Sequence, residues 1–216
     1  KMGRREPVNS LSFVISVRDY SQYQWAKEKN ASFIIAPSEI ILKDENPLTD
    51  KTVVSIPPVI TVRETQIIKE EIKKLKEKGV KYAYAENISH LEFLKGFEII
   101  YSSRMNIMNT VAGKFLPDAL IYTISKELNL KDAGYVLRGK PVMAEGYGYQ
   151  SMMLTENCIK KSVNGKCIDA LSYLKDRKNQ LFPVVCLRNC RNEILNSVPL
   201  VVSDKLSQFK KAFEKE

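Results

Sequence analysis

Histidine is almost absent from this sequence. His90 is the only histidine among 216 residues, which excludes the H-E-x-x-H zinc motif and any metal site built from several histidines. A Ser–His or Cys–His catalytic pair would have to use His90, which lies near an expected helix start, and we expect it there at the surface or in a capping role. No G-x-S-x-G segment and no aspartic-protease pair is present either. We therefore find no motif for a proteolytic mechanism.

Long apolar runs are lacking as well. No stretch reaches the roughly 18 residues that a transmembrane helix needs, and the basic, polar residues 1–10 are not followed by the apolar segment of a signal peptide. We therefore expect a cytoplasmic protein that does not enter a membrane. The net charge of +9 suits nucleic acid, an acidic substrate or an anionic surface as a partner, although a lysine-rich solvated surface would give the same value.

Short runs rich in β-branched and aromatic residues recur along the first two thirds of the chain. Helical patterns fill several of the gaps between them, most clearly at 63–79, where Ile68, Ile72 and Leu75 share one face and Gly79 suits a C-cap. Alternating strands and helices predict a parallel sheet with right-handed crossovers. The expected strands lie in residues 12–17, 32–37, 52–57, 81–86, 97–103, 119–125 and 141–148.

This pattern favours an α/β protein with a (β/α) barrel of the TIM type. No G-x-G-x-x-G follows the first strand, which disfavours a dinucleotide-binding sheet. A full barrel usually needs about 250 residues, so we expect a partial or truncated one. We place the barrel portion in residues 1–150, and a cysteine-bearing segment with a terminal helix, packed on the barrel, in residues 151–216.

All four cysteines fall within the second of these regions. Their spacing is C-x8-C, 18 residues, then C-x3-C. Structural zinc favours two short knuckles, and the first pair is too far apart for one, while disulfides need an oxidising compartment. An iron–sulfur cluster tolerates irregular spacing and is the favoured reading. Zinc, two disulfides and unliganded buried thiols remain open. The four residues are Cys158, Cys167, Cys186 and Cys190.

Several segments, taken in order, carry a family resemblance. They read YSSRMNIMNTVA, IYTISKELNL, EGYGYQSMM, MMLTENC, YLKDRKNQLFPVVC and NEILNSVPLVVSDKL. Together they resemble the peptidase U32 family, also called collagenase-like peptidases, over about residues 80–205. The matches to its D-R-K/R-G-x-x-F-P-V and I-x-N-S-x-P-L stretches are Asp176, Arg177, Lys178, Phe182, Pro183, Val184, Ile194, Asn196, Ser197, Pro199 and Leu200.

The sequence departs from that family at three points. Asn179 stands where the family usually has Gly, Cys158 is not followed by the frequent Pro, and the chain stops after its last helix, where family members continue into another strand. We therefore expect that the rest of a longer chain or another subunit supplies the missing part of the barrel.

The resemblance implies a cofactor and an activity. It implies that the four cysteines bind a [4Fe–4S] cluster, with zinc as the alternative, in a barrel enzyme. Better-understood relatives hydroxylate RNA bases or quinone precursors without oxygen, so we expect an iron–sulfur-dependent modifier of RNA bases (tRNA or rRNA) or of a related small molecule. A U32 peptidase and a non-catalytic binding module of a larger enzyme are the alternatives.

Residues just past the strand ends are the other candidates for the site, because such residues form the active sites of α/β barrels. We expect catalytic roles for Glu127 as a general acid or base, for Arg104 as a clamp on phosphate or carboxylate and for Tyr147 as a stacking or proton-donating group. Asn106 is expected to bind substrate. Each of these residues alone would also suit a cap, a salt bridge or a rim position.

Basic residues near the cysteines complete the predicted site. Arg177 and Lys178 are expected to contact substrate, although a turn with an internal ion pair would equally explain them. If RNA is the partner, we expect one basic face that carries Arg104, Arg177, Lys178, Arg188 and Arg191.

Overall fold

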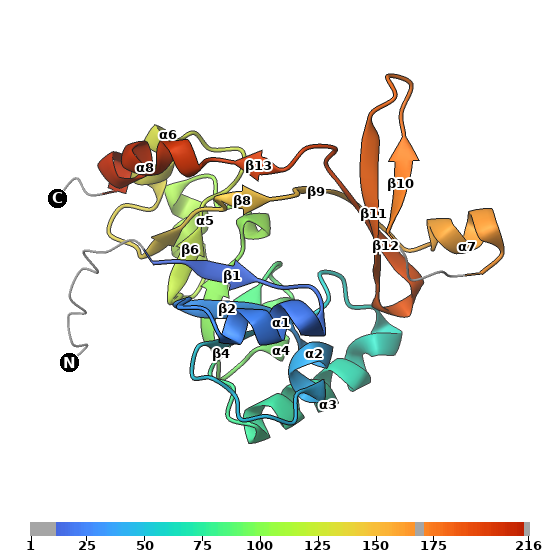
Figure 1. Cartoon of the computed structure of the whole chain (residues 1–216). Coiled ribbons are helices and arrows are strands. Elements are labelled where there is room, and N and C mark those ends of the chain that lie inside the picture. Colours follow the sequence, from blue (N-terminus) through green and yellow to red (C-terminus); the bar gives the residue numbers. More distant parts are fainter. Residues whose placement is uncertain (1–11, 167–170, 214–216) are drawn as a thin grey trace. The chain divides into compact units, whose positions relative to one another are not determined.

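The computed structural model describes residues 12–166 and 171–213 (Figure 1). The chain divides into two compact units, residues 1–144 and 145–216, close to the expected boundary after residue 150. We describe each unit by itself. None of the helices in the described ranges is long and apolar enough to cross a membrane.

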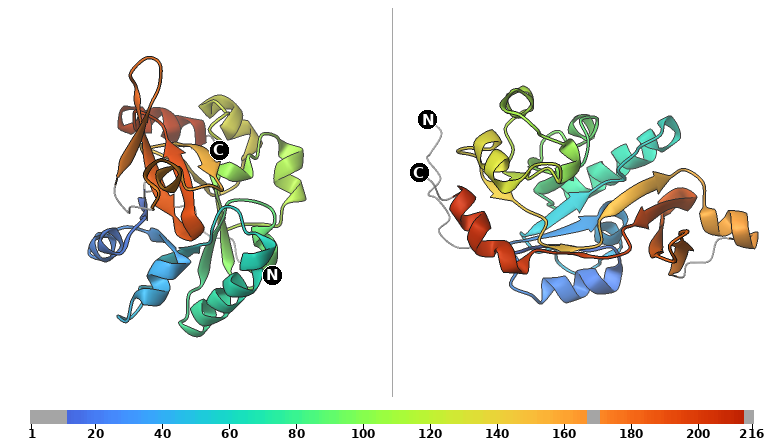
Figure 2. Two further views of the ribbon diagram at one scale, coloured as in Figure 1. Left: turned by 90° about the vertical axis from the view of Figure 1, so that its right-hand side faces the viewer. Right: turned by 90° about the horizontal axis from the view of Figure 1, so that it is seen from above.

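The first unit is built on one parallel sheet. Its seven strands follow one another in sequence order, and each pairs in parallel with the next. Each of the seven predicted runs contains one strand of this sheet, so the predicted parallel α/β architecture is confirmed as a half-barrel sheet flanked by helices (Figure 2). The strands are β1 (Val14–Ser16), β2 (Phe33–Pro37), β3 (Thr52–Ser55), β4 (Tyr82–Ala85), β5 (Glu98–Tyr101), β6 (Ile121–Thr123) and β7 (Val142–Met143).

Helices connect these strands, and local capping fixes several of them. The Asp19 carboxylate accepts a hydrogen bond from the Gln22 N–H at 2.8 Å and begins α1. In α3 the predicted face Ile68, Ile72 and Leu75 is buried, as an amphipathic helix on a sheet requires. The helices are α1 (Tyr20–Lys27), α2 (Ser38–Lys43), α3 (Thr65–Glu77), α4 (His90–Phe93), α5 (Thr110–Phe115) and α6 (Leu130–Val136), with short 3-10 turns at η1 (Val62–Glu64) and η2 (Ser103–Met105).

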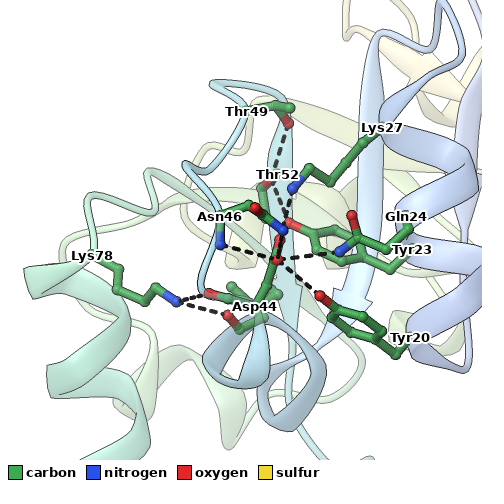
Figure 3. Close-up of polar contacts among 10 residues, drawn as sticks. Tyr20, Tyr23, Gln24, Lys27, Asp44, Asn46, Thr49, Thr52 and Lys78 are labelled. Atoms are coloured by element: carbon green, nitrogen blue, oxygen red, sulfur yellow. Dashed lines mark hydrogen bonds and ion pairs between the residues drawn. The ribbon is translucent and has the colours of Figure 1, made fainter.

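One buried carboxylate ties α1 to the end of α2. Asp44 is fully buried, and its Oδ2 accepts a hydrogen bond from Lys27 Nζ at 2.7 Å, while Oδ1 accepts bonds from Tyr20, Gln24 and Asn46 (Figure 3). Burial alone would raise the pKa of this carboxyl, but the hydrogen bonds from Lys27 and Asn46 outweigh it and lower the pKa to about 2. This network therefore depends on an ionised Asp44.

The second unit is antiparallel. Four strands pair in the order β10-β11-β12-β9, and two further strands, β8 and β13, pair with each other. The sequence did not predict this sheet. The strands are β8 (Tyr147–Gly148), β9 (Ser151–Thr155), β10 (Ser172–Lys175), β11 (Leu181–Leu187), β12 (Arg191–Leu195) and β13 (Leu200–Val201), with α7 (Ile159–Asn164), α8 (Leu206–Phe213) and two 3-10 turns at η3 (Arg188–Cys190) and η4 (Ser203–Lys205).

One predicted strand was too long. The run 141–148 is divided, because β7 ends at Met143 and Tyr147 lies in β8, paired with Val201. Residues 144–146 lie between the two strands and belong to neither. The sequence analysis expected Tyr147 at the end of a parallel strand. Tyr147 lies instead in the antiparallel pair of β8 and β13.

Candidate functional site

An ion pair lies where β4 and β5 end. Arg104 Nε contacts Glu86 Oε1 at 3.3 Å, and both side chains are partly buried. The Arg104 backbone N–H donates to Ser102 Oγ at 3.1 Å, which begins η2. The predicted clamp residue is thus a guanidinium held in place at the carboxyl ends of two neighbouring strands, where a barrel enzyme places its site.

Asn106 and Glu127 lie next to each other in the same unit. Ser125 Oγ donates to Asn106 Oδ1 at 2.6 Å, and Asn106 Nδ2 donates to Glu127 Oε1 at 3.5 Å. Asn106 has φ +48°, a left-handed conformation that Asn tolerates better than most residues. The segment after β5 is therefore bonded to the segment after β6, and two of the predicted site residues meet there.

A pocket of about 330 Å³ opens beside Arg104. Arg104 and Asn87 are its polar walls, and the remainder is apolar. The sequence analysis did not single out these apolar residues, because side chains such as Ile88 and Phe115 carry no reactive group. The apolar walls are Ile88, Met105, Ala112, Phe115 and Leu116.

We expected His90 at the surface or in a capping role, but it is fully buried as the first residue of α4, whose N-cap is Ser89. Its Nδ1 accepts a hydrogen bond from the Glu86 backbone N–H at 3.2 Å, and Nε2 has no hydrogen-bond partner among the described residues. Burial lowers the pKa of His90, although the backbone of Pro57 and Pro58 partly opposes the shift. The side chain is therefore a neutral support for the loop that carries Glu86.

The other predicted site residues lie in the second unit. Tyr147 is 80% exposed. Arg177 and Lys178 lie at the tip of the hairpin between β10 and β11, and both are exposed. Arg191 is only 4% exposed, and its Nε contacts Glu156 Oε1 at 3.0 Å. Arg191 therefore does not belong to a solvent-facing basic surface, as the sequence analysis had expected.

Two cysteines line one pocket of the second unit. Cys158 and Cys190 share a pocket of about 450 Å³ with Glu156, Lys161 and other polar residues. Both carry thiols, as does Cys186. Cys158 begins α7, and its sulfur accepts a hydrogen bond from the Lys161 backbone N–H at 3.4 Å.

Asn192 connects this pocket to the third thiol. Its Oδ1 accepts a hydrogen bond from the Ile159 N–H at 2.6 Å, next to Cys158, and its Nδ2 donates to Cys186 Sγ at 3.5 Å. Asn192 is fully buried on β12. The three described cysteines are thus arranged around one end of the antiparallel sheet, and Asn192 is a residue that the sequence analysis missed.

Metal binding by this arrangement stays a prediction. Within residues 12–166 and 171–213, no group of three His, Cys, Asp or Glu side chains lies close enough together to hold a metal ion. Cys167 lies outside the described residues. The donor chemistry does suit a thiolate-bound group, because two thiols face one pocket and both Cys158 and Cys186 accept hydrogen bonds from N–H groups.

Comparisons with family models, with curated proteins and with solved structures found no match.

Proposed function

We propose that this chain is an iron–sulfur-dependent enzyme of the U32 type, which hydroxylates or otherwise modifies RNA bases or a related small molecule. The observation that carries the proposal is the pocket shared by Cys158 and Cys190, to which Asn192 links Cys186. A cluster bound there would supply the electron transfer of the reaction. Cys158, Cys186 and Cys190, with Cys167, would hold it.

The chain's own residues have separate roles in this proposal. Asn192 fixes the start of α7 beside Cys158 and donates to Cys186, so it orients two ligands at once. Lys161 lines the same pocket, and its positive charge would attract an anionic group bound there.

The first unit supports the same proposal through its strand ends. The segments YSSRMNIMNTVA and IYTISKELNL, which contribute to the family resemblance, meet through the Ser125–Asn106–Glu127 hydrogen bonds. We propose that the sheet is part of a TIM-type barrel in a cytoplasmic enzyme, and that Arg104 and Glu127 act at its carboxyl edge. Arg104 would hold an anionic group of the substrate, and Glu127 would exchange a proton with it.

In the peptidase alternative, His90 would have to be the general base. A Cys–His or Ser–His mechanism needs a histidine that reaches substrate, whereas His90 is fully buried and its Nδ1 is occupied by the Glu86 N–H. A non-catalytic binding module would keep the pockets without any reaction.

Cofactor analysis is the first experiment. Protein purified without oxygen should contain iron and sulfide, and Cys158→Ser or Cys190→Ser should lose both. Ser162→Ala is the matched control, because Ser162 lines the same pocket without a thiol, and it should keep the cluster. Stoichiometric zinc in the purified protein, with no iron, would show that the cysteines form a zinc site and do not bind a cluster.

The reaction is tested on RNA. A strain that lacks the gene should lose one hydroxylated nucleoside from tRNA or rRNA, measured by mass spectrometry, and the Cys158→Ser protein should not restore it. An unchanged nucleoside profile together with proteolysis by the purified, metal-free protein would instead establish the peptidase.

A further inference from the structure

The turn between β10 and β11 is held by one aspartate. Asp176 Oδ1 accepts hydrogen bonds from the Lys178 N–H at 2.8 Å and from the Gln180 N–H at 2.9 Å. The Asn179 N–H donates to the Asp176 carbonyl at 3.1 Å. A carboxylate that accepts backbone N–H groups in this way fixes a turn. The fixed turn presents the side chains of Arg177 and Lys178 at its apex.

The hairpin that carries this turn is unusually exposed. We call residues 172–183 the basic hairpin, and it extends away from the rest of its sheet (Figures 1 and 2). Tyr173 is 51% exposed and Leu181 is 50% exposed. Exposed apolar side chains mark an interaction surface where they lie side by side rather than scattered singly.

Register places an aromatic ring and a cation on one face of the basic hairpin. Tyr173 pairs with Pro183, and Lys175 pairs with Leu181. Directly paired residues lie on the same face of a sheet, and alternate residues of a strand do so too. Tyr173, Lys175 and Leu181 therefore share one face, close to the basic apex.

We propose that the basic hairpin binds single-stranded nucleic acid. Arg177 and Lys178 contact phosphates, and a base stacks on Tyr173 beside Lys175. Cationic side chains next to an exposed aromatic ring are the combination that binds a single strand without reading its sequence. The hairpin carries three cations against one carboxylate, within a chain of net charge +9. The choice of RNA over DNA rests on the proposed function.

Binding of a short fluorescein-labelled oligouridylate, followed by anisotropy, tests the phosphate contacts. The logarithm of affinity should fall linearly with the logarithm of salt concentration, with a slope of about −0.7 per phosphate contacted. The double variant Arg177→Ala/Lys178→Ala should flatten that slope by about one to two units. The control Lys73→Ala/Lys74→Ala removes the same charge from exposed positions of α3 and should leave the slope unchanged. Equal slopes for the two double variants would overturn the proposal.

Stacking is tested separately at one salt concentration. Tyr173→Ala should weaken oligouridylate binding by roughly 5- to 150-fold, whereas Tyr173→Phe keeps the ring and should bind like the original protein. Inorganic polyphosphate has no bases, so its binding should not respond to Tyr173→Ala. Binding to phosphatidylserine vesicles in place of oligouridylate would overturn the proposal in favour of a membrane surface.

These measurements also separate the inference from the proposed function. The binding measurements need no cluster and no reaction. If the protein binds oligouridylate through the hairpin while loss of the gene leaves the nucleoside profile unchanged, only the proposed function is refuted. If the protein hydroxylates a base, yet variants without Arg177, Lys178 and Tyr173 bind oligouridylate equally well, only the inference about the hairpin is refuted.

Discussion

The inner strands of the two units bury different kinds of side chain. In the first unit the strands β2 and β3 bury Ile35 and Val53, which pack with Ile100 of β5 in one apolar core. In the second unit the inner strand β12 is buried along its whole length, yet it begins with Arg191, Asn192 and Glu193. Apolar packing is non-directional, whereas buried polar groups need their hydrogen bonds. Asn192 accordingly bonds to the segments on either side of it.

This difference indicates which substitutions should destabilise each unit most. The sheet of the first unit should respond mainly to lost volume in its core, because its inner strands are covered by apolar contacts. The buried Asp44 network between α1 and α2 is the polar exception in that unit. The second should respond to the loss of single polar atoms, because an unsatisfied buried donor or acceptor is destabilising by itself. The predictions that follow test this contrast, beginning with the largest expected effect.

Truncation of the first unit's core should have the largest effect. Leu75→Ala removes a fully buried side chain of α3 and should lower the free energy of unfolding by about 2 to 5 kcal/mol. Ile67→Ala is the matched control in the same helix, because Ile67 is largely exposed, and should change it by only a few tenths. Urea denaturation measures both. Equal losses would mean that α3 is not held by its buried face.

Protonation of Asp44 should have the next largest effect. Its pKa is lowered to about 2 from an ordinary value near 3.8, so the folded state binds this proton less tightly than the unfolded state does. The resulting stability, about 2 kcal/mol, is present above the unfolded pKa and is lost as pH falls from about 5 to 2. Asp44→Asn should remove it at neutral pH and reduce the acid dependence.

The control for Asp44 is its exposed neighbour. Glu45→Gln should leave the unfolding free energy at pH 7 nearly unchanged. The measurement is thermal unfolding from pH 7 to pH 2. If the midpoint temperature of the Asp44→Asn variant changes with pH in the same way as that of the unaltered protein, the network around Asp44 does not stabilise the fold through its charge.

The second unit should be sensitive at Asn192. Asn192→Ala removes a fully buried side chain and leaves the partly buried Ile159 N–H without its acceptor, which should destabilise the unit by about 1 to 3 kcal/mol. Hydrogen exchange should show faster exchange in β9, β11 and β12, while the strands of the first unit keep their protection. Asn157→Ala, at an exposed position of the same pocket, should change neither. Faster exchange spread evenly over both units would contradict the contrast.

The same contrast explains what could be predicted from the sequence. In the first unit, strands covered on both faces read as short apolar runs and α3 as a 3.6-residue period, so both were found. In the second unit Met152 and Met153 of β9 are both largely exposed, which leaves no alternation to find. The polar start of β12 reads as surface, although it is buried.

The candidate site divides in a similar way. Residues just past strand ends can be named once the strands are known, and Asn106 and Glu127 do lie together. Tyr147 was misplaced because the run 141–148 contains two strands, and Tyr147 belongs to the second, which pairs with β13. Asn192 could not be found, because its role depends on bonds to residues distant in the sequence, Ile159 and Cys186.

The smallest expected effect concerns Asn179, at the turn of the basic hairpin. Asn179 has φ +63°, so the position needs a residue that adopts the left-handed conformation, which Asn tolerates better than most residues. Asn179→Ala should destabilise the hairpin by about 1 kcal/mol. Asn179→Gly should change stability by less than about 0.5 kcal/mol, since its relief of strain is offset by the greater freedom of the unfolded chain. Gln180→Ala, in the same turn but without positive φ, should be neutral. Hydrogen exchange of the β10 and β11 amides measures all three, and equal protection in the Ala and Gly variants would show that backbone strain at residue 179 does not shape this turn.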